Sequence, residues 1–310
     1  MIKRVLITGA NAGLGKEAAL QLAARPEVEV VYLGCRNKHK AAAAQQELEQ
    51  ITGRNIFEVL EIDVSDIASV ERAVHDLPQS VDALIMNAGG TGGKRFSAIN
   101  SAGVTEIFAV NLLGHSVLTE RLLKCGKLTQ VAVYAGSEAA RGVPEMGMPR
   151  PNLSTSSVEE FMRICDGSAF AKNQDATAHY GPIKYMGALW MSAMARRHPH
   201  IKFVTMSPGA TKGTEGFNTL PFFKQYAMKG MMQVMLWLGK VHRVETGSAR
   251  YLTALFDENL ESGRFYASKK GLTGALDAQH HVYPDLDNPQ FQDNALLAIE
   301  RFAIKLKRPQ

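Results

Sequence analysis

The stretch RVLITGANAGLGKEAALQLAAR, residues 4–25, decides the predicted fold because one tight turn joins two kinds of pattern in it. The β-branched run RVLITG (4–9) predicts a buried strand, and GLGKEAALQLAAR (13–25) predicts a helix that Pro26 ends. A strand that passes into a helix through a glycine-rich turn is typical of the start of a βαβ unit. The stretch therefore predicts an α/β fold.

The turn itself, TGANAGLG (8–15), has the form that binds the pyrophosphate of a dinucleotide. Glycines permit a close approach of backbone to ligand, and the helix N-terminus offers N–H groups and the positive end of a dipole. We therefore expect a dinucleotide here, with a tight turn that binds no ligand as the alternative. The residues expected to bind the cofactor are Thr8, Gly9, Asn11, Gly13, Leu14 and Gly15.

Apolar runs and helical patterns alternate along the rest of the chain. Further strands are expected at 28–34, 56–64, 81–89, 128–136, 201–209 and 263–268. Further helices are expected at 38–51, 66–77 with Asp66 as its cap, 103–124, 179–197, 245–257 and 288–306. Such spacing implies right-handed crossovers and a parallel sheet covered on both faces. The prediction is a single Rossmann-type domain over residues 1–310, a doubly wound parallel sheet in three αβα layers.

Two less regular segments, 138–177 and 210–243, are expected to be insertions that border a substrate pocket, because each follows a predicted strand. The second contains AMKGMMQVMLWLG (227–239), which is too short to span a bilayer. A lid or buried helix, a contact with a membrane surface and a subunit contact all stay open for it. Nine apolar side chains of the two segments are expected to line a substrate pocket, and packing in the core or in a subunit contact is an equal alternative. They are Met146, Met148, Phe217, Phe222, Phe223, Met228, Met231, Met232 and Trp237.

Composition narrows the class of protein. Of the 310 residues 45% are hydrophobic and 21% are charged, which is typical of a globular chain with a sizeable core. The net charge of +5 comes without a long basic run, so an anionic cofactor is favoured over nucleic acid. Cys35, Cys125 and Cys165 are scattered, so neither a disulfide framework nor a metal site is expected. A cytoplasmic location, without a signal peptide or an integral membrane span, is the expectation.

The end of the second predicted strand indicates which nicotinamide cofactor binds. Arg36 stands 21 residues after Gly15, where an acidic residue would select NAD through the 2′-hydroxyl. Arginine makes charge-assisted bonds to a 2′-phosphate, so NADP(H) is predicted, with a solvated arginine as the alternative. Ligands of open α/β sheets lie at the carboxyl ends of strands. Further cofactor-binding residues are therefore expected at Asn37, Asp63, Val64, Asn87, Ala88 and Gly89.

The stretch AHYGPIKYMGALW (178–190) sets Tyr180 four residues before Lys184. These positions share one face of a helix, so a phenol and an ammonium can meet. Pro182 is expected near the start of this helix, where its missing N–H costs nothing. Tyr266 and Lys270 have the same spacing, but Tyr266 ends a predicted strand, where such positions do not converge.

Together these residues resemble the short-chain dehydrogenase/reductase family, over about residues 3–268. The likeness is closest to its branch of retinol dehydrogenases and protochlorophyllide reductases. In one departure from the main branch, 43 positions separate Ser137 from Tyr180, and protochlorophyllide reductases have a long insertion here. The motifs that carry the resemblance are TGANAGLG (8–15), Asp63-Val64, NAGG (87–90), Asn111, Ser137, Tyr180-x-x-x-Lys184 and Pro208-Gly209.

The resemblance implies a role for each residue of the site. Tyr180 would donate the proton as hydride reaches a carbonyl, and the Lys184 ammonium would lower the pKa of that phenol. Lys184 would also hold the nicotinamide ribose, and Ser137 would bind the substrate oxygen. Asn111 would hold a water that links Lys184 to solvent. Pro208, Gly209 and Thr211 would lie beside the nicotinamide carboxamide and the diphosphate.

The predicted function is NADP(H)-dependent hydride transfer to or from an apolar carbonyl or alcohol. An alkene reductase of the protochlorophyllide type is the alternative within enzymes. A non-catalytic NADP(H) sensor that binds a partner is the alternative outside them, although it would not need the tyrosine and the lysine. The substrate, the physiological direction, peripheral membrane contact and a homo-oligomer stay open.

Overall fold

The computed structural model describes residues 1–144, 149–171, 175–211 and 241–305. The predicted insertion at 210–243, with its methionine-rich stretch 227–239, therefore lies almost wholly outside the described residues. So do Met146 and Met148 of the first insertion.

One eight-stranded sheet organises the chain, in the order β3-β2-β1-β4-β5-β6-β7-β8. The first seven strands are parallel, and β8 pairs with β7 in the antiparallel sense. The predicted Rossmann-type sheet is confirmed, whereas β8 escaped prediction because Leu-Asp-Ala has no apolar run. The strands are β1 Arg4–Thr8, β2 Val30–Cys35, β3 Phe57–Glu61, β4 Val81–Met86, β5 Leu128–Ala135, β6 Lys202–Met206, β7 Arg264–Ser268 and β8 Leu276–Ala278.

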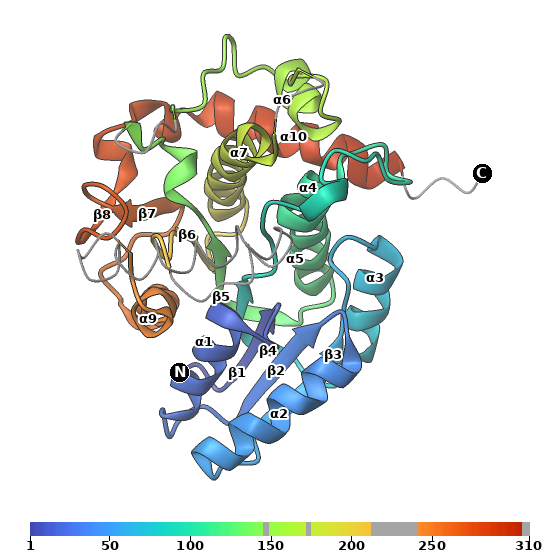
Figure 1. Cartoon of the computed structure of the whole chain (residues 1–310), viewed down its shortest axis with the longest axis vertical. Coiled ribbons are helices and arrows are strands. Elements are labelled where there is room, and N and C mark those ends of the chain that lie inside the picture. The colour runs from blue at the N-terminus through green and yellow to red at the C-terminus, as the bar shows by residue number, and fades with distance from the viewer. Residues whose placement is uncertain (145–148, 172–174, 212–240, 306–310) are drawn as a thin grey trace, which may run out of the picture.

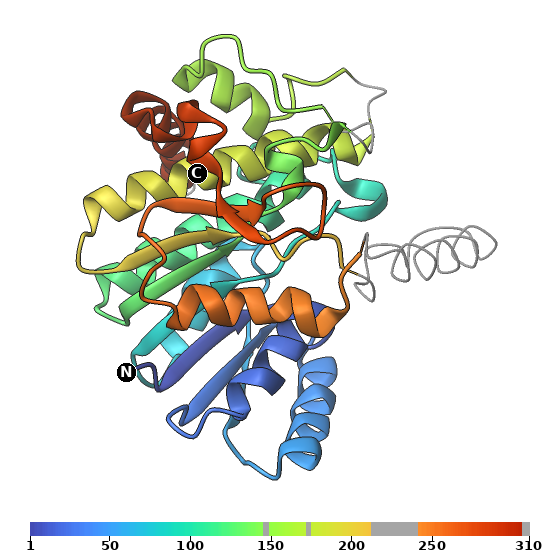
Figure 2. The same cartoon turned by 90° about the vertical axis from the view of Figure 1, so that its left-hand side faces the viewer.

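Helices cover both faces of this sheet (Figures 1 and 2). Side chains alternate along β1, so that Leu6 packs into one core while Val5 and Ile7 pack into the other. The second core holds α1 Gly13–Ala23, α2 Lys38–Thr52 and α9 Val244–Phe256. The first core holds α3 Ile67–Asp76, α5 Gly114–Lys124 and α7 Ala176–Arg197, with α6 Val158–Cys165 and α10 Pro289–Lys305 packed outside α7.

The helix expected over 103–124 is interrupted. A short α4, Glu106–Phe108, passes into a π-helical turn over Ala109–Leu113 before α5 begins. Asn111 lies in that turn, and its side-chain amide donates to the carbonyl of Ile107 at 2.8 Å. Such π turns re-aim side chains and occur often at functional sites.

The helix that carries Tyr180 begins earlier than predicted. Asp175 caps its N-terminus by accepting from the amide of Thr177, so α7 runs for 22 residues from Ala176. Pro182 is therefore the seventh residue of α7, and its expected place at the helix start is wrong. The helix tolerates this proline because most of its later residues are buried and tertiary packing stabilises it.

Neither a membrane span nor a metal cluster is found in the described part of the chain. No helix there combines the length and the apolar character that crossing a bilayer requires. No group of three or more His, Cys, Asp or Glu side chains there is placed to hold a metal ion.

The start of α5 packs so closely against the loop that follows β3 that only glycine fits at the contact. A β-carbon at Gly114 would lie 1.6 Å from the carbonyl oxygen of Val64. Because the neighbour is backbone, a side chain at 114 would force the two segments apart.

We predict that Gly114→Ala lowers the free energy of unfolding by about 3 kcal/mol, measured by urea denaturation. The control is Gly53→Ala, since Gly53 has φ +67° but open space around its missing β-carbon. Only left-handed backbone strain of about 1 kcal/mol is expected there. Equal losses in the two variants would show that the close approach to Val64 does not matter.

Candidate active site

The site lies where the strand order reverses, at the carboxyl ends of β1 and β4. Gly9 adopts φ +68°, and a β-carbon at Gly15 would lie 2.4 Å from its carbonyl oxygen. Ala12, at the N-cap of α1, makes no side-chain capping bond, and the first turn of α1 has no acidic residue. A closely approachable backbone and an uncapped, non-acidic helix start fit a bound phosphate group.

The predicted residues Thr8, Asn87 and Ala88 brace this turn. The Asn87 side-chain amide donates to the carbonyls of Thr8 at 3.0 Å and Gly9 at 3.2 Å. The Ala88 amide donates to the hydroxyl of Thr8 at 3.0 Å. That hydroxyl also lies 3.0 Å from Nε2 of buried His115. These bonds hold the turn after β1 against the end of β4.

Two further predicted contacts of the turn face other elements. The backbone N–H groups of Ala10 and Asn11 lie near the Cys35 sulfur at the end of β2, where they oppose the rise in the thiol pKa that burial causes. The Leu14 carbonyl accepts from the hydroxyl of Ser248 in α9 at 2.8 Å. Asn11 and Leu14 thus tie the turn after β1 to β2 and to α9.

The residues after β2 and β3 lie at the next two strand ends. The Arg36 side chain is 78% exposed, and its Nε lies 3.8 Å from a carboxylate oxygen of Asp63. The other oxygen of Asp63 accepts from the amide and the hydroxyl of Ser65. The Asn37 side chain caps the N-terminus of α2, because its Oδ1 accepts from the Lys40 amide. Arg36 thus presents an exposed guanidinium beside the expected adenosine position.

Ser137, Tyr180 and Lys184 meet at the carboxyl end of β5. The Ser137 hydroxyl lies near enough to the phenol of half-buried Tyr180 to lower its pKa. The Lys184 ammonium nitrogen donates to the Ala135 carbonyl at 2.8 Å and lies 5.4 Å from the centre of the Tyr180 ring. Tyr266 packs instead in the core on the opposite face of the sheet, and its hydroxyl accepts from the Glu261 amide.

Burial shifts both ionisable groups toward their neutral forms. It raises the pKa of the Tyr180 phenol to about 12, with the Glu138 carboxylate adding to the rise and the Ser137 hydrogen bond opposing it. It lowers the pKa of the Lys184 ammonium to about 7. The expected lowering of the Tyr180 pKa by Lys184 is therefore not seen, because burial is the largest influence on this phenol.

Asn111 is bonded to the chain on every side. Its side-chain amide donates to the Gly90 carbonyl at 2.7 Å, and its Oδ1 accepts from the Gly90 amide at 3.0 Å. Its backbone carbonyl accepts from the Tyr134 hydroxyl at 2.9 Å. A β-carbon at Gly89 would lie 2.6 Å from Oδ1 of Asn111 and 3.8 Å from the Lys184 nitrogen. Asn111 thus fixes the loop after β4 beside Lys184.

The turn after β6 reaches the same side of the sheet. Gly209 adopts φ +77°, and its amide donates to the hydroxyl of Ser207 at 3.2 Å. The Thr211 hydroxyl donates to the Gly209 carbonyl at 3.2 Å. Pro208 and Gly209 are therefore held in one compact turn.

Two functional candidates were missed by the sequence analysis. Glu138, directly after Ser137, is 3% exposed, and Arg250 in α9 is 7% exposed. The closest atoms of the two side chains are 3.6 Å apart. A charged residue beside a strand end, in the otherwise small-residue run AGSEAA (135–140), was the only signal available for Glu138.

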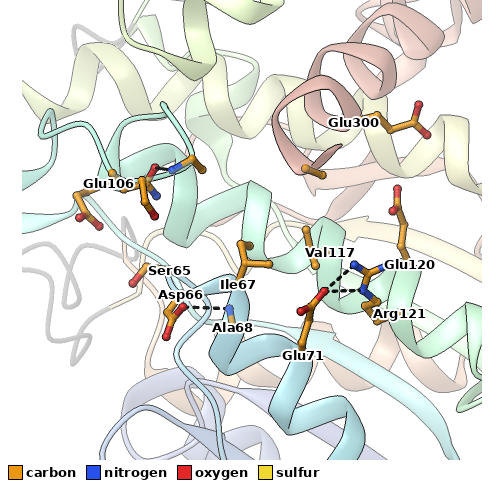
Figure 3. A pocket seen from close by; sticks show the side chains of 14 residues that line it. Ser65, Asp66, Ile67, Ala68, Glu71, Glu106, Val117, Glu120, Arg121 and Glu300 are labelled. Atoms are coloured by element: carbon orange, nitrogen blue, oxygen red, sulfur yellow. Dashed lines mark hydrogen bonds and ion pairs between the residues drawn. The ribbon is translucent and has the colours of Figure 1, made fainter. Parts of the chain in front are cut away.

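A cleft of the described residues lies away from this site. It has a volume of about 760 Å³ and lies between α3, α5 and α10 (Figure 3). None of the predicted site residues lines it, and Glu71 within it pairs with Arg121 at 2.6 Å. Its acidic side chains disfavour an anionic dinucleotide; they are Asp66, Glu71, Glu106, Glu120 and Glu300.

Sequence relatives agree with this architecture. The family described as short chain dehydrogenase matches residues 3–144. Dehydrogenase/reductase SDR family member 13 of Homo sapiens is 34% identical over 321 residues, covering 94% of this chain and 78% of that protein. Retinol dehydrogenase 11 of Mus musculus is 33% identical over 123 residues, covering 39% of this chain and 38% of that protein.

Solved structures share the fold. The NADPH-bound carbonyl reductase from chicken fatty liver has a TM-score of 0.57 and 18% identity, over 88% of this chain and 99% of that one. The predicted resemblance to the retinol dehydrogenase branch is confirmed by the sequence relatives, whereas the likeness to protochlorophyllide reductases stays a prediction. The chain therefore belongs to the short-chain dehydrogenase/reductase family of oxidoreductases.

Proposed function

We propose that this protein is an NADP(H)-dependent reductase of apolar carbonyl compounds in which Tyr180 is the proton donor. The observation that carries the proposal is the meeting of Ser137, Tyr180 and Lys184 at one strand end, beside the glycine turn. A protein that only sensed the nucleotide would not need this constellation.

The chemistry divides between cofactor and chain. NADPH, when bound, supplies the hydride. Tyr180 supplies a proton to the oxygen that gains charge, while the Ser137 hydroxyl orients that oxygen. Burial raises the pKa of Tyr180 to about 12, so the phenol keeps its proton at neutral pH, as a proton donor must. Lys184 stabilises the phenolate left behind, from a site that excludes bulk water.

Selection of NADP(H) rests on Arg36. Its exposed guanidinium follows β2, where the 2′-substituent of an adenosine is expected, and its nearest carboxylate, that of Asp63, is 3.8 Å away. Such a distance leaves its N–H donors available for a phosphate.

An apolar substrate is favoured by the branch of the family. Retinol dehydrogenase 11, one of the relatives, is named for an apolar alcohol. The predicted lining residues of the second insertion, which lie outside the described residues, are rich in Met and Phe. The cytoplasmic location, a single domain and the substrate-side roles remain proposals.

We predict that Tyr180→Phe lowers kcat for carbonyl reduction by about 10³-fold, because the phenol that would donate the proton is lost. NADPH affinity should change little, as measured by fluorescence titration. Tyr266→Phe is the matched control and should keep full activity. The substrates are retinal, a steroid ketone, an aromatic ketone and a conjugated alkene. Turnover of the alkene alone would favour the alkene reductase, and nucleotide binding without any turnover would favour the sensor.

We predict that Arg36→Ala weakens NADPH binding by about 10- to 100-fold and leaves NADH binding unchanged, because a charge-assisted contact to the 2′-phosphate is lost. Dissociation constants of both nucleotides measure this directly. Arg72→Ala is the control, since Arg72 is also exposed and lies 3.7 Å from a carboxylate, that of Asp66. Equal losses for NADPH and NADH would contradict the assignment of Arg36.

Burial of the Lys184 ammonium lowers the free energy of unfolding of the chain. Its pKa of about 7 lies below the ordinary value of 10.5, so the folded chain disfavours the ammonium. The cost is full below pH 7 and disappears as the pH rises toward 10.5. No described carboxylate lies within ion-pair distance to offset it.

We predict that Lys184→Met abolishes turnover and yet raises Tm at pH 6 by roughly 5 °C. The gain should be less than half as large at pH 9, where the folded lysine is already neutral and only the unfolded lysine, with its ordinary pKa of 10.5, still carries charge. Differential scanning calorimetry of both proteins at the two pH values measures it. A difference in Tm that does not depend on pH would contradict the buried-ammonium account.

A further inference from the structure

Glu138 is a buried carboxylate to which the proposed chemistry gives no direct part beyond raising the pKa of Tyr180. It follows Ser137 directly, begins a short 3₁₀ turn over Glu138–Ala140, and is 3% exposed. Burying a charge is expensive, and a buried ion pair is seldom a net gain in stability over apolar packing. A role other than stability is therefore worth seeking in what the carboxylate contacts.

Both oxygens of Glu138 bind the ends of neighbouring strands. One accepts from the hydroxyl of Ser207, the residue directly after β6. The other accepts from the amide of Ser268 at 3.1 Å and from its hydroxyl at 2.9 Å, at the end of β7. The residue next to Ser137 thus connects the ends of β5, β6 and β7.

Arg250 completes the connection from α9. Its guanidinium donates to the Ser207 carbonyl at 3.1 Å and to the Ser268 hydroxyl at 3.2 Å. It also donates to the Gly274 carbonyl at 2.8 Å and lies 2.9 Å from Nε2 of His242. The two charged side chains therefore share Ser207 and Ser268 as partners.

The shared partners lead to the turn that is expected beside the nicotinamide. The Ser207 hydroxyl, which donates to Glu138, accepts from the Gly209 amide. Arg250 packs on the same glycine, because a β-carbon there would lie 3.1 Å from its Nη1 and 2.7 Å from Cδ2 of His242. The His242 amide in turn donates to the Ala210 carbonyl at 2.6 Å. Glu138 and Arg250 therefore both support the Pro208–Gly209 turn, Glu138 through Ser207 and Arg250 by direct packing.

We propose that Glu138 and Arg250 are a positioning pair that fixes the Pro208–Gly209 turn relative to Ser137, and so sets the nicotinamide ring against the substrate oxygen. The inference rests on the proposed function for the identity of the two ligands. Neither residue touches the reacting atoms. Glu138 acts through Ser137 and Ser207, and Arg250 acts through Ser207 and Gly209. A small displacement of such a turn can cost about 10²-fold in rate, because hydride transfer requires close alignment.

The test uses Glu138→Gln, which keeps the size of the side chain but removes its charge and one acceptor oxygen. An amide group would face the Ser207 hydroxyl or the guanidinium, so the turn should shift. We expect kcat to fall by about 10- to 100-fold with a smaller change in KM for the carbonyl. Binding of NADP⁺ should weaken about 10-fold, while binding of adenosine 2′,5′-bisphosphate, which lacks the nicotinamide half, should not change.

The matched control is Asp82→Asn. Asp82 is also a buried carboxylate, 6% exposed, and accepts from the amides of Lys3 and Arg4 at the opposite end of the sheet. It should lose stability without loss of kcat or of nicotinamide-selective binding. Arg250→Met and the double variant with Glu138→Gln complete a cycle, in which the double variant should be no worse than the worse single one.

The outcomes separate the two claims. Loss of kcat and of NADP⁺ binding in Glu138→Gln alone, with the adenosine bisphosphate unaffected, supports the positioning pair. Three results would overturn it while the wild-type enzyme remains active. They are equal effects in Asp82→Asn, equal weakening of both ligands by Glu138→Gln, and wild-type behaviour of Glu138→Gln. A wild-type protein that binds neither ligand overturns the proposed function, and the inference with it.

Discussion

The site depends on one close contact, the approach of the turn after β1 to the end of β4. Only glycine fits at position 15, where a β-carbon would lie 2.4 Å from the Gly9 carbonyl oxygen and 2.5 Å from the Asn87 amide nitrogen. The same Asn87 bonds to the carbonyls of Thr8 and Gly9. The contact sets where α1 begins, and it brings the glycine turn to the strand reversal at which open α/β sheets bind their ligands.

Charged side chains are buried near the ends of β5 and β6, and their burial lowers the stability of the fold. Lys184 lies buried with one carbonyl partner, and burial lowers its pKa to about 7. Glu138 and Arg250 lie buried beneath the turn after β6. Apolar side chains would make a more stable core at these positions. These groups gather near the carboxyl ends of β5 and β6, where the positioning and the proton transfer are proposed to take place.

The order of strands and helices was predictable because each parallel strand is a short apolar run and the glycine turn marks the first crossover. The features that were missed depend on contacts distant in sequence. Glu138 meets Ser268 across 130 positions, and no local pattern indicates that pairing. The start of α7 was misplaced because Asp175 caps it from within a segment without clear periodicity. The direction of the Tyr180 pKa shift was missed because spacing reveals neighbours but not burial.

The most direct measurement is a crystal structure of the protein with NADP⁺ bound. The account predicts the diphosphate at the start of α1, the 2′-phosphate on Arg36, and the Tyr180 hydroxyl about 3–4 Å from the place of a substrate oxygen at C4 of the nicotinamide. Lys184 should reach the nicotinamide ribose. A bound nucleotide with the Tyr180 side chain turned away from the ring, into packing, would contradict the account.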